Sequence, residues 1–131
     1  MKYKVVIKPN MPNLNDFLKA ERTTLRTNGK LNTKGNLMKK EWQKRCVMFI
    51  RLTLKGKKLK PPVDIHYHYF EKDKRRDKGN IHAFCQKVFE DALQQAGTLP
   101  NDGWNEIRNF SAEFDVDKNN PRVEITITEV D

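Results

Sequence analysis

The chain has 131 residues and carries 26 Lys and Arg against 17 Asp and Glu, a formal net charge of +9. The charge is divided unevenly: residues 1–60 hold 17 basic and 3 acidic side chains (17 − 3 = +14), and residues 61–131 hold 9 basic and 14 acidic ones (9 − 14 = −5). This length fits one domain, the apolar runs are too short to span a bilayer, and no secretory signal opens the chain, so we expect a cytoplasmic protein with no membrane segment and a polyanionic partner such as nucleic acid.

The basic half, residues 1–60, is predicted to contain one strand and one or two helices. In residues 2–8, the apolar side chains of Tyr3, Val5 and Ile7 alternate with Lys4 and Lys8 on the other face, which is the period of a half-buried strand. Asn13 or Asn15 could cap a short helix that continues to about residue 26, and residues 27–36 have the composition of a basic loop with a turn at Asn28-Gly29. Apolar residues at helical spacing then predict an amphipathic helix from about 36 to 54 with a basic outer face.

The acidic half, residues 61–131, predicts a strand, a helix and two further strands. Residues 63–70 alternate strictly, and residues 71–78 form a charged loop. An apolar stripe from Ile81 to Ala96 predicts a helix that Gly97 ends, and strands follow at 107–116 and 122–130. We therefore predict an α+β fold over residues 1–131, a single small domain with a mixed β-sheet of about four strands and two to three helices largely on one face.

Three aspartates flank or lie within the predicted third helix. Asp77 precedes it, Asp91 lies inside it at the border of the apolar stripe, and Asp102 follows it in a turn, so the three could converge. Carboxylates are suited to bind Mg²⁺, which assists phosphodiester hydrolysis, and Lys87, one turn before Asp91, could stabilise charge on a phosphate. Asp77 could instead cap the helix, and Asp102 could simply shape its turn.

The same segments resemble one family. The runs Lys74–Ile81, Lys87–Leu93 and Asn101–Trp104 are similar to the RusA-type Holliday junction resolvases, which are Mg²⁺-dependent homodimeric endonucleases of bacteria and prophages. Residues 12–15 and the strand at 121–127 are also similar. The resemblance implies that Asp77 and Asp102 are ligands of Mg²⁺ (or Mn²⁺), that Lys87 is catalytic, and that Asp91 is an acidic site residue and a further ligand.

Two positions depart from the family pattern. Gly79 stands where the second aspartate of an Asp-x-Asp pair belongs, and the spacing from Asn80 to Lys87 is longer than in short family members by about one helical turn. A whole turn preserves the facing of Lys87, whereas Gly79 removes an expected carboxylate. Either Asp91 or Glu71 supplies the missing oxygen, or the chain binds junctions and cuts them poorly.

Basic residues near the motif and in the basic half are predicted to hold DNA phosphates. We expect an endonuclease that resolves four-way junctions by paired nicking in recombination and repair, acting as a homodimer on branched DNA. The alternative is a non-catalytic protein that binds branched DNA. The predicted DNA-binding residues are Lys39, Lys40, Lys44, Lys57, Lys58, Lys74, Arg75, Arg76, Lys78 and Asn80.

A rival zinc site would combine His66 and His68 with His82 and Cys85. It is disfavoured because Cys85 lies on the apolar stripe, where a buried free cysteine is ordinary, so we expect His66 and His68 to face solvent, a partner chain or DNA. Three aromatic residues that could stack on bases are expected in the core instead, whereas Trp104 in the turn beside Asp102 is the better stacking candidate. The three are Trp42, Tyr67 and Tyr69.

Overall fold

The fold is built around one four-stranded mixed sheet. In the computed structural model, which describes residues 1–130, the strand order is β1-β6-β4-β5. β6 pairs antiparallel with β1 and β4, and β4 pairs parallel with β5. The strands are β1 (Lys2–Ile7), β4 (Val63–Glu71), β5 (Ile107–Val116) and β6 (Arg122–Glu129). The expected α+β fold with a mixed sheet is confirmed.

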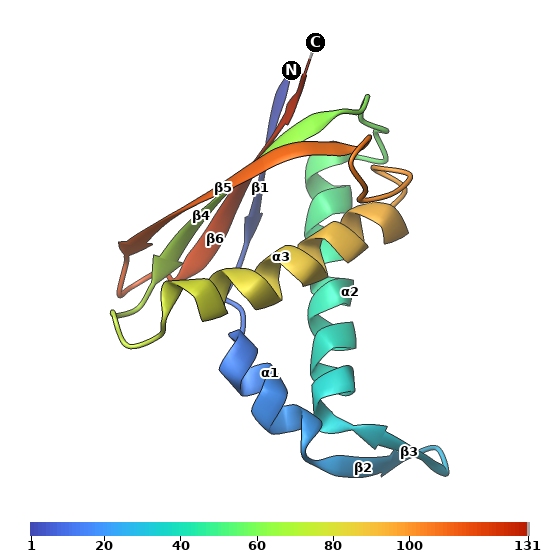
Figure 1. Cartoon of the computed structure of the whole chain (residues 1–131), viewed down its shortest axis with the longest axis vertical. Coiled ribbons are helices and arrows are strands. Elements are labelled where there is room, and N and C mark those ends of the chain that lie inside the picture. The colour runs from blue at the N-terminus through green and yellow to red at the C-terminus, as the bar shows by residue number, and fades with distance from the viewer. Residues whose placement is uncertain (131) are drawn as a thin grey trace.

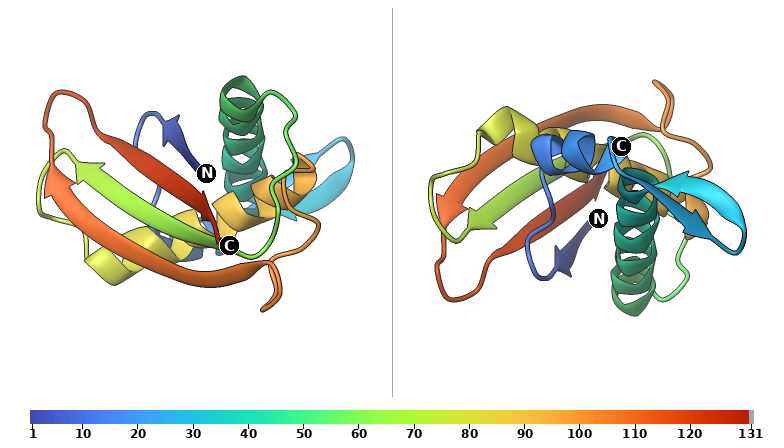
Figure 2. Two further views of the ribbon diagram at one scale, coloured as in Figure 1. Left: turned by 90° about the horizontal axis from the view of Figure 1, so that it is seen from above. Right: turned by 90° about the horizontal axis from the view of Figure 1, so that it is seen from below.

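Three helices lie on one side of this sheet and leave its other face open (Figure 1; Figure 2). They are α1 (Leu14–Glu21), α2 (Lys34–Leu54) and α3 (Lys78–Gln95). α2 packs against α3 and β1, and α1 packs against both other helices. No helix within residues 1–130 has the length and apolar character that crossing a membrane requires.

The core lies between the helices and the covered face of the sheet. β4 alternates strictly, so that Val63, Ile65, Tyr67 and Tyr69 are buried while the residues between them point to the open face. The apolar stripe of α3 supplies the opposing layer, and Gly97 follows that helix with a φ of 75°, as expected for the residue that ends it. The register of β4 therefore decides which side chains are available to a ligand on the open face.

Residues 22–33 differ from the sequence prediction. The first helix ends at Glu21 rather than near residue 26, and the expected loop is a hairpin of β2 (Thr24–Thr27) and β3 (Lys30–Thr33). Asn28 and Gly29 take φ values of 52° and 77°, as a two-residue hairpin turn requires. α2 then begins directly at Lys34. The hairpin lies at the end of the molecule farthest from the termini (Figure 1).

Candidate nucleic-acid and metal sites

Helix α3 separates Asp77 from Asp91, two of the three aspartates that could have converged by their places in the sequence. Asp77 is the residue before α3 and Asp91 lies near its other end, so a rise of 1.5 Å per residue places them about 21 Å apart along the axis. Asp102 follows the same far end. Mg²⁺ ligands lie 2.0–2.1 Å from the ion, so Asp77 and Asp91 do not fit one ion within a single chain.

Asp91 and Lys87 are brought together with a residue from the basic half. Lys87 Nζ lies 3.3 Å from Asp91 Oδ1 across one turn of α3, and Lys39 Nζ of α2 lies 3.8 Å from Asp91 Oδ2. Two ammonium groups on one carboxylate leave a net charge of about +1 at the α2–α3 contact. This cluster can attract a phosphate, and it is one of the places where the two oppositely charged halves of the chain meet, as the Lys4–Glu124 pair also is.

Glu90, which sequence reasoning did not single out, shares this end of α3 with Asp91 and Asp102. Partial burial raises the pKa of the Glu90 carboxyl, and the negative charges of Asp102 and Asp91 raise it further against the opposing effects of Gln86 and Lys87. Gln86 donates a hydrogen bond to Glu90 Oε2 at 2.9 Å. Asp102 and Asp91 are therefore both near enough to Glu90 for their charges to raise the pKa of its carboxyl.

The N-terminal end of α3 borders a cavity of about 520 Å³. Three predicted DNA-binding residues line it, namely Lys74, Arg76 and Lys78, together with the carboxylates of Glu71, Asp73 and Asp115. Asp77, beside it in the chain, is exposed at the N-cap position and makes no side-chain capping bond. The alternative in which Asp77 serves as the helix cap through its side chain therefore finds no support in the structure.

Glu71 is held in a buried ion pair with Arg76. Arg76 donates from Nε and Nη2 to the two carboxylate oxygens at 2.8 and 3.0 Å, and Asn10 donates to the same carboxylate at 3.3 Å. Because both oxygens are occupied, Glu71 is a poor source of the carboxylate that Gly79 lacks. Arg76 is likewise committed to the fold, with its guanidinium also 3.6 Å from Asp16.

The other predicted DNA-binding residues lie mainly at the surface. Lys40 and Lys44 are exposed on α2, and Lys57 and Lys58 are exposed beyond its end, with Lys57 Nζ 5.0 Å from the centre of the Tyr3 ring. A separate set surrounds the start of α3: Arg75 is exposed and 3.7 Å from Asp73, Lys78 lies over Phe114, and Asn80 is half-buried.

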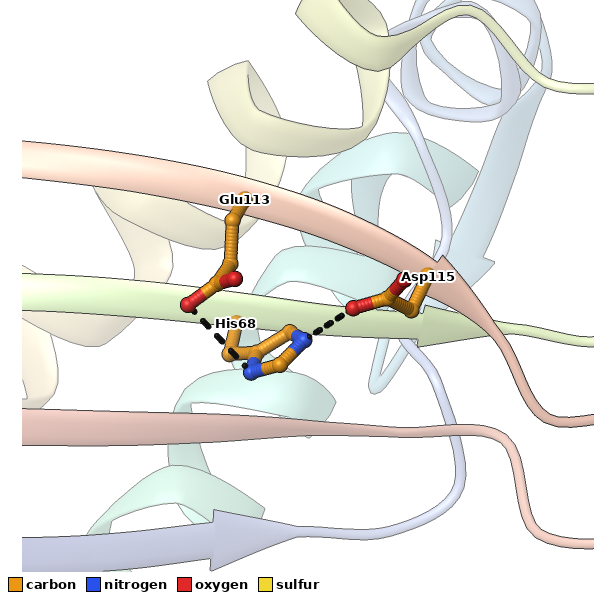
Figure 3. A group of neighbouring side chains, drawn as sticks. All are labelled: His68, Glu113 and Asp115. Atoms are coloured by element: carbon orange, nitrogen blue, oxygen red, sulfur yellow. Dashed lines mark hydrogen bonds and ion pairs between the residues drawn. The ribbon is translucent and has the colours of Figure 1, made fainter.

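Two histidines and two carboxylates meet on the open face of the sheet, in a group that the sequence did not predict. His68, Glu113 and Asp115 each offer an atom such that all three lie within 4.8 Å of one another, and they form a candidate metal-binding triad (Figure 3). His68 Nε2 lies 2.6 Å from Asp115 Oδ2, and His66 Nε2 lies 2.6 Å from Glu113 Oε1. Within residues 1–130, no such group of three contains Asp77, Asp91 or Asp102.

The rival zinc site with His82 and Cys85 does not form. His82 lies on the helix side of the sheet, where its Nδ1 is 2.6 Å from the Tyr69 hydroxyl, while His66 and His68 face the opposite side. Cys85 is buried, and burial raises the pKa of its thiol to about 12. The sheet itself therefore separates the four residues.

The aromatic residues lie mostly where they were expected. Tyr67 and Tyr69 are buried, and Trp42 packs against the core with Arg45 over its ring at 4.6 Å. Trp104 is 98% exposed in the turn beside Asp102. It remains available to stack on a base at the same end of α3 as Asp91.

Comparison with known proteins gives no family: no protein-family model and no curated protein sequence matches the chain.

Proposed function

We propose that the chain is a divalent-cation-dependent endonuclease that cuts branched DNA such as four-way junctions, as a homodimer, in DNA recombination and repair. The observation that carries this proposal is the meeting of Lys39 and Lys87 at Asp91. It combines a phosphate-attracting pair of lysines with a carboxylate at a contact between the basic and acidic halves. A cytoplasmic location is part of the proposal, because the DNA substrate is found there in bacteria and their prophages.

The basic surface of α2 and of the hairpin would hold the DNA backbone. Lys40 and Lys44 are exposed along α2 and continue the positive charge away from Lys39. Arg26 and Lys30 extend the positive charge onto the β2–β3 hairpin, where every residue of β2 is exposed. Contacts of this kind position a duplex without reading its sequence, which suits recognition of a branched shape.

The cation site requires a second copy of the chain. Mg²⁺ (or Mn²⁺), when bound, would neutralise charge on the phosphate, and the proposed ligands are Asp77, Asp91 and Asp102. Because Asp77 lies about 21 Å along α3 from Asp91, one ion can be shared only if Asp77 of one copy approaches Asp91 and Asp102 of the other. Two α3 helices packed antiparallel about a twofold axis satisfy this requirement and create two equal sites.

Strand β5 offers the edge for such a pairing. In the described part of the chain it pairs with β4 alone, and almost all of its ten residues are exposed. Two apolar side chains of this strand are exposed, Phe110 by 55% and Val116 by 47%. Helix α3 lies beside the strand, because His82 of α3 contacts Phe110. A long unpaired edge with exposed apolar side chains is suited to join a second copy. Pairing of two β5 edges would also bring the two α3 helices side by side.

A cleavage assay on a synthetic four-way junction tests this function. The wild-type chain should nick opposing strands at paired positions with Mg²⁺ or Mn²⁺ and not with EDTA. Lys87→Ala should lower the cleavage rate by about 100-fold or more, since it removes a cation aimed at developing charge. Lys118→Ala, an exposed lysine in the β5–β6 turn, is the matched control and should cut at the wild-type rate.

The alternative function is binding of branched DNA without cleavage. It is favoured by Gly79 at the expected position of a carboxylate and by the separation of Asp77 from Asp91 in one chain. Under this alternative the same assay shows tight junction binding and no nicking with any divalent cation. That result would overturn the endonuclease proposal.

A further inference from the structure

The β2–β3 hairpin is an arm with an anchored base and a free tip (Figure 1). Its two strands form a sheet of their own. At the base, Lys34 N donates to Thr23 O at 2.8 Å, and Thr33 Oγ1 donates to Glu21 Oε1 at 2.6 Å. At the tip, no atom of residues 1–130 beyond the adjacent residues lies within 4 Å of the Cβ position of Gly29. The arm is therefore held at one end and open to a ligand at the other.

Each face of the hairpin carries one leucine that the core does not use. Leu31 lies opposite Arg26 on one face, and Leu25 lies opposite Asn32 on the other. Leu31 is 67% exposed and Leu25 is 42% exposed. In the described part of the chain, neither belongs to the core or to the partly buried apolar residues packed against it. Both leucines can therefore gain from burial against a bound molecule.

The charge of this segment points to DNA as the ligand. Between Glu21 and Glu41 the chain carries six basic side chains and no acidic one. Arg26 shares a face with Leu31, and Lys30, opposite Thr27, shares the other face with Leu25. A polyanion such as a DNA backbone neutralises a run of this kind. Each face of the hairpin thus combines a cation suited to a phosphate with an apolar side chain.

We propose that the hairpin is a DNA-binding arm that inserts Leu31 between bases at a branch point, while Arg26 on the same face contacts an adjoining phosphate. The proposal rests on the proposed function, because branched DNA is the ligand, and it adds Leu31 as the residue that distinguishes a branch from a linear duplex. Leucine is among the apolar side chains that proteins insert between base steps, against the cost of unstacking them. Unstacking costs least where the regular duplex is already interrupted, as it is at a branch point.

The arm lies beside the proposed cleavage cluster. Lys39 follows the first residue of α2 by five residues, which is about 8 Å along the helix. Leu31 precedes that residue by three, which is at most about 11 Å of extended chain. Leu31 and Lys39 are therefore within about 20 Å of each other, a span of about six base pairs. One bound DNA branch can contact both, with Leu31 at the branch point and Lys39 near the phosphate to be cut.

Fluorescence of a four-way junction with 2-aminopurine beside the branch point tests the insertion without requiring cleavage. In EDTA, the wild type should bind the junction and raise the fluorescence, because unstacking relieves the quenching of 2-aminopurine by its neighbours. Leu31→Ser should remove most of this rise and weaken junction affinity by about 10-fold, as the loss of one buried leucine contact implies. Its affinity for a linear duplex of the same length should change by less than about 2-fold, because phosphate contacts dominate that binding.

A charge variant and a matched leucine separate insertion from other effects. Arg26→Ala should weaken binding to both DNAs and lower the slope of log affinity against log salt by about 1. Leu52→Ser is the matched control, since Leu52 is 66% exposed on α2, and it should leave the fluorescence rise and both affinities unchanged. Circular dichroism of each variant confirms the fold, and the exposure of both leucines makes unfolding unexpected.

The proposal is overturned if the wild type binds the junction and Leu31→Ser gives the same fluorescence rise and affinity. It is also overturned if Leu31→Ser leaves the fluorescence unchanged and alters the oligomeric state in sedimentation, because the hairpin then binds a second copy of the chain. A wild type that does not bind the junction would overturn the proposed function and the arm together. A wild type that shows the Leu31 effect in EDTA and never nicks the junction with Mg²⁺ supports the arm and overturns the endonuclease function alone.

Discussion

Replacement of the buried carboxylate Glu71 should destabilise the fold, because this side chain holds Arg76 beside the start of α3. Glu71→Gln keeps the side-chain volume but removes the charge that accepts two hydrogen bonds from Arg76. Loss of one partner from a buried ion pair costs 3–5 kcal/mol, and we expect about 3 kcal/mol because the Arg76 side chain is 23% exposed. For a chain of this length, that corresponds to a fall in Tm of roughly 12 °C.

Thermal unfolding followed by circular dichroism measures this effect, with a neighbouring arginine as control. Arg75→Met breaks an exposed pair with Asp73 at a side chain that is 87% exposed, so it should cost less than about 1 kcal/mol. Adding Arg76→Met to Glu71→Gln should restore part of the lost stability, because the unpaired cation is removed as well. The structural role is refuted if Glu71→Gln melts within about 2 °C of the wild type while junction cleavage is lost. Glu71 would then supply a carboxylate oxygen to the cleavage site.

Three further substitutions test local features of the structure. Gly79→Asp should raise stability by about 0.5–1 kcal/mol in a thermal melt, because no atom lies within 4 Å of its Cβ position and a carboxylate is favoured in the first turn of a helix; a lower Tm would contradict this. Tyr67→Phe should leave the free energy of unfolding unchanged or raise it by up to about 1 kcal/mol, because the buried hydroxyl has no hydrogen-bond partner; a loss of more than about 1 kcal/mol in urea unfolding would reveal one. Glu90→Gln should be more stable than the wild type at pH 7 and equal to it below the unfolded pKa of about 4.3, because the raised pKa of the Glu90 carboxyl means that its charged form destabilises the folded chain. Solvent keeps the gain in the free energy of unfolding below about 1 kcal/mol. Equal urea midpoints of the two proteins at pH 7 would contradict the prediction.

Much of the fold could be predicted because its signals are local. The strict alternation of β4 between Val63 and Phe70 identified both the strand and its buried face, and the apolar stripe of α3 with Gly97 after it identified the helix and its end. Both patterns follow from the repeat of a single element, so one sequence is sufficient. The β2–β3 hairpin was missed although its Asn28-Gly29 turn was recognised, because its exposed, Thr-rich strands have no apolar alternation.

The candidate sites depend on contacts between distant segments, and these were less predictable. Lys39 contacts Asp91 only because α2 packs on α3. His68 lies 45 residues before Glu113 in the chain, and the two meet only because β4 and β5 pair in parallel. The separation of Asp77 from Asp91 could have been calculated from the predicted helix, since its length alone fixes the distance. Convergence was considered instead because the three aspartates flank or lie within one predicted helix, and the length of that helix was not taken into account.

Mixing of two inactive variants tests the central claim most directly, namely that two copies of the chain build each cleavage site. Asp77→Asn and Asp91→Asn should each fail to nick a four-way junction with Mg²⁺. After subunit exchange, half of the dimers are mixed and each has one intact site, so nicking should recover to about one quarter of the wild-type rate. If the carboxylates act within one chain, every site in the mixture lacks a ligand. An active wild type whose mixed variants remain inactive would therefore contradict the two-chain site, and a wild type that binds the junction without nicking it would contradict the endonuclease function.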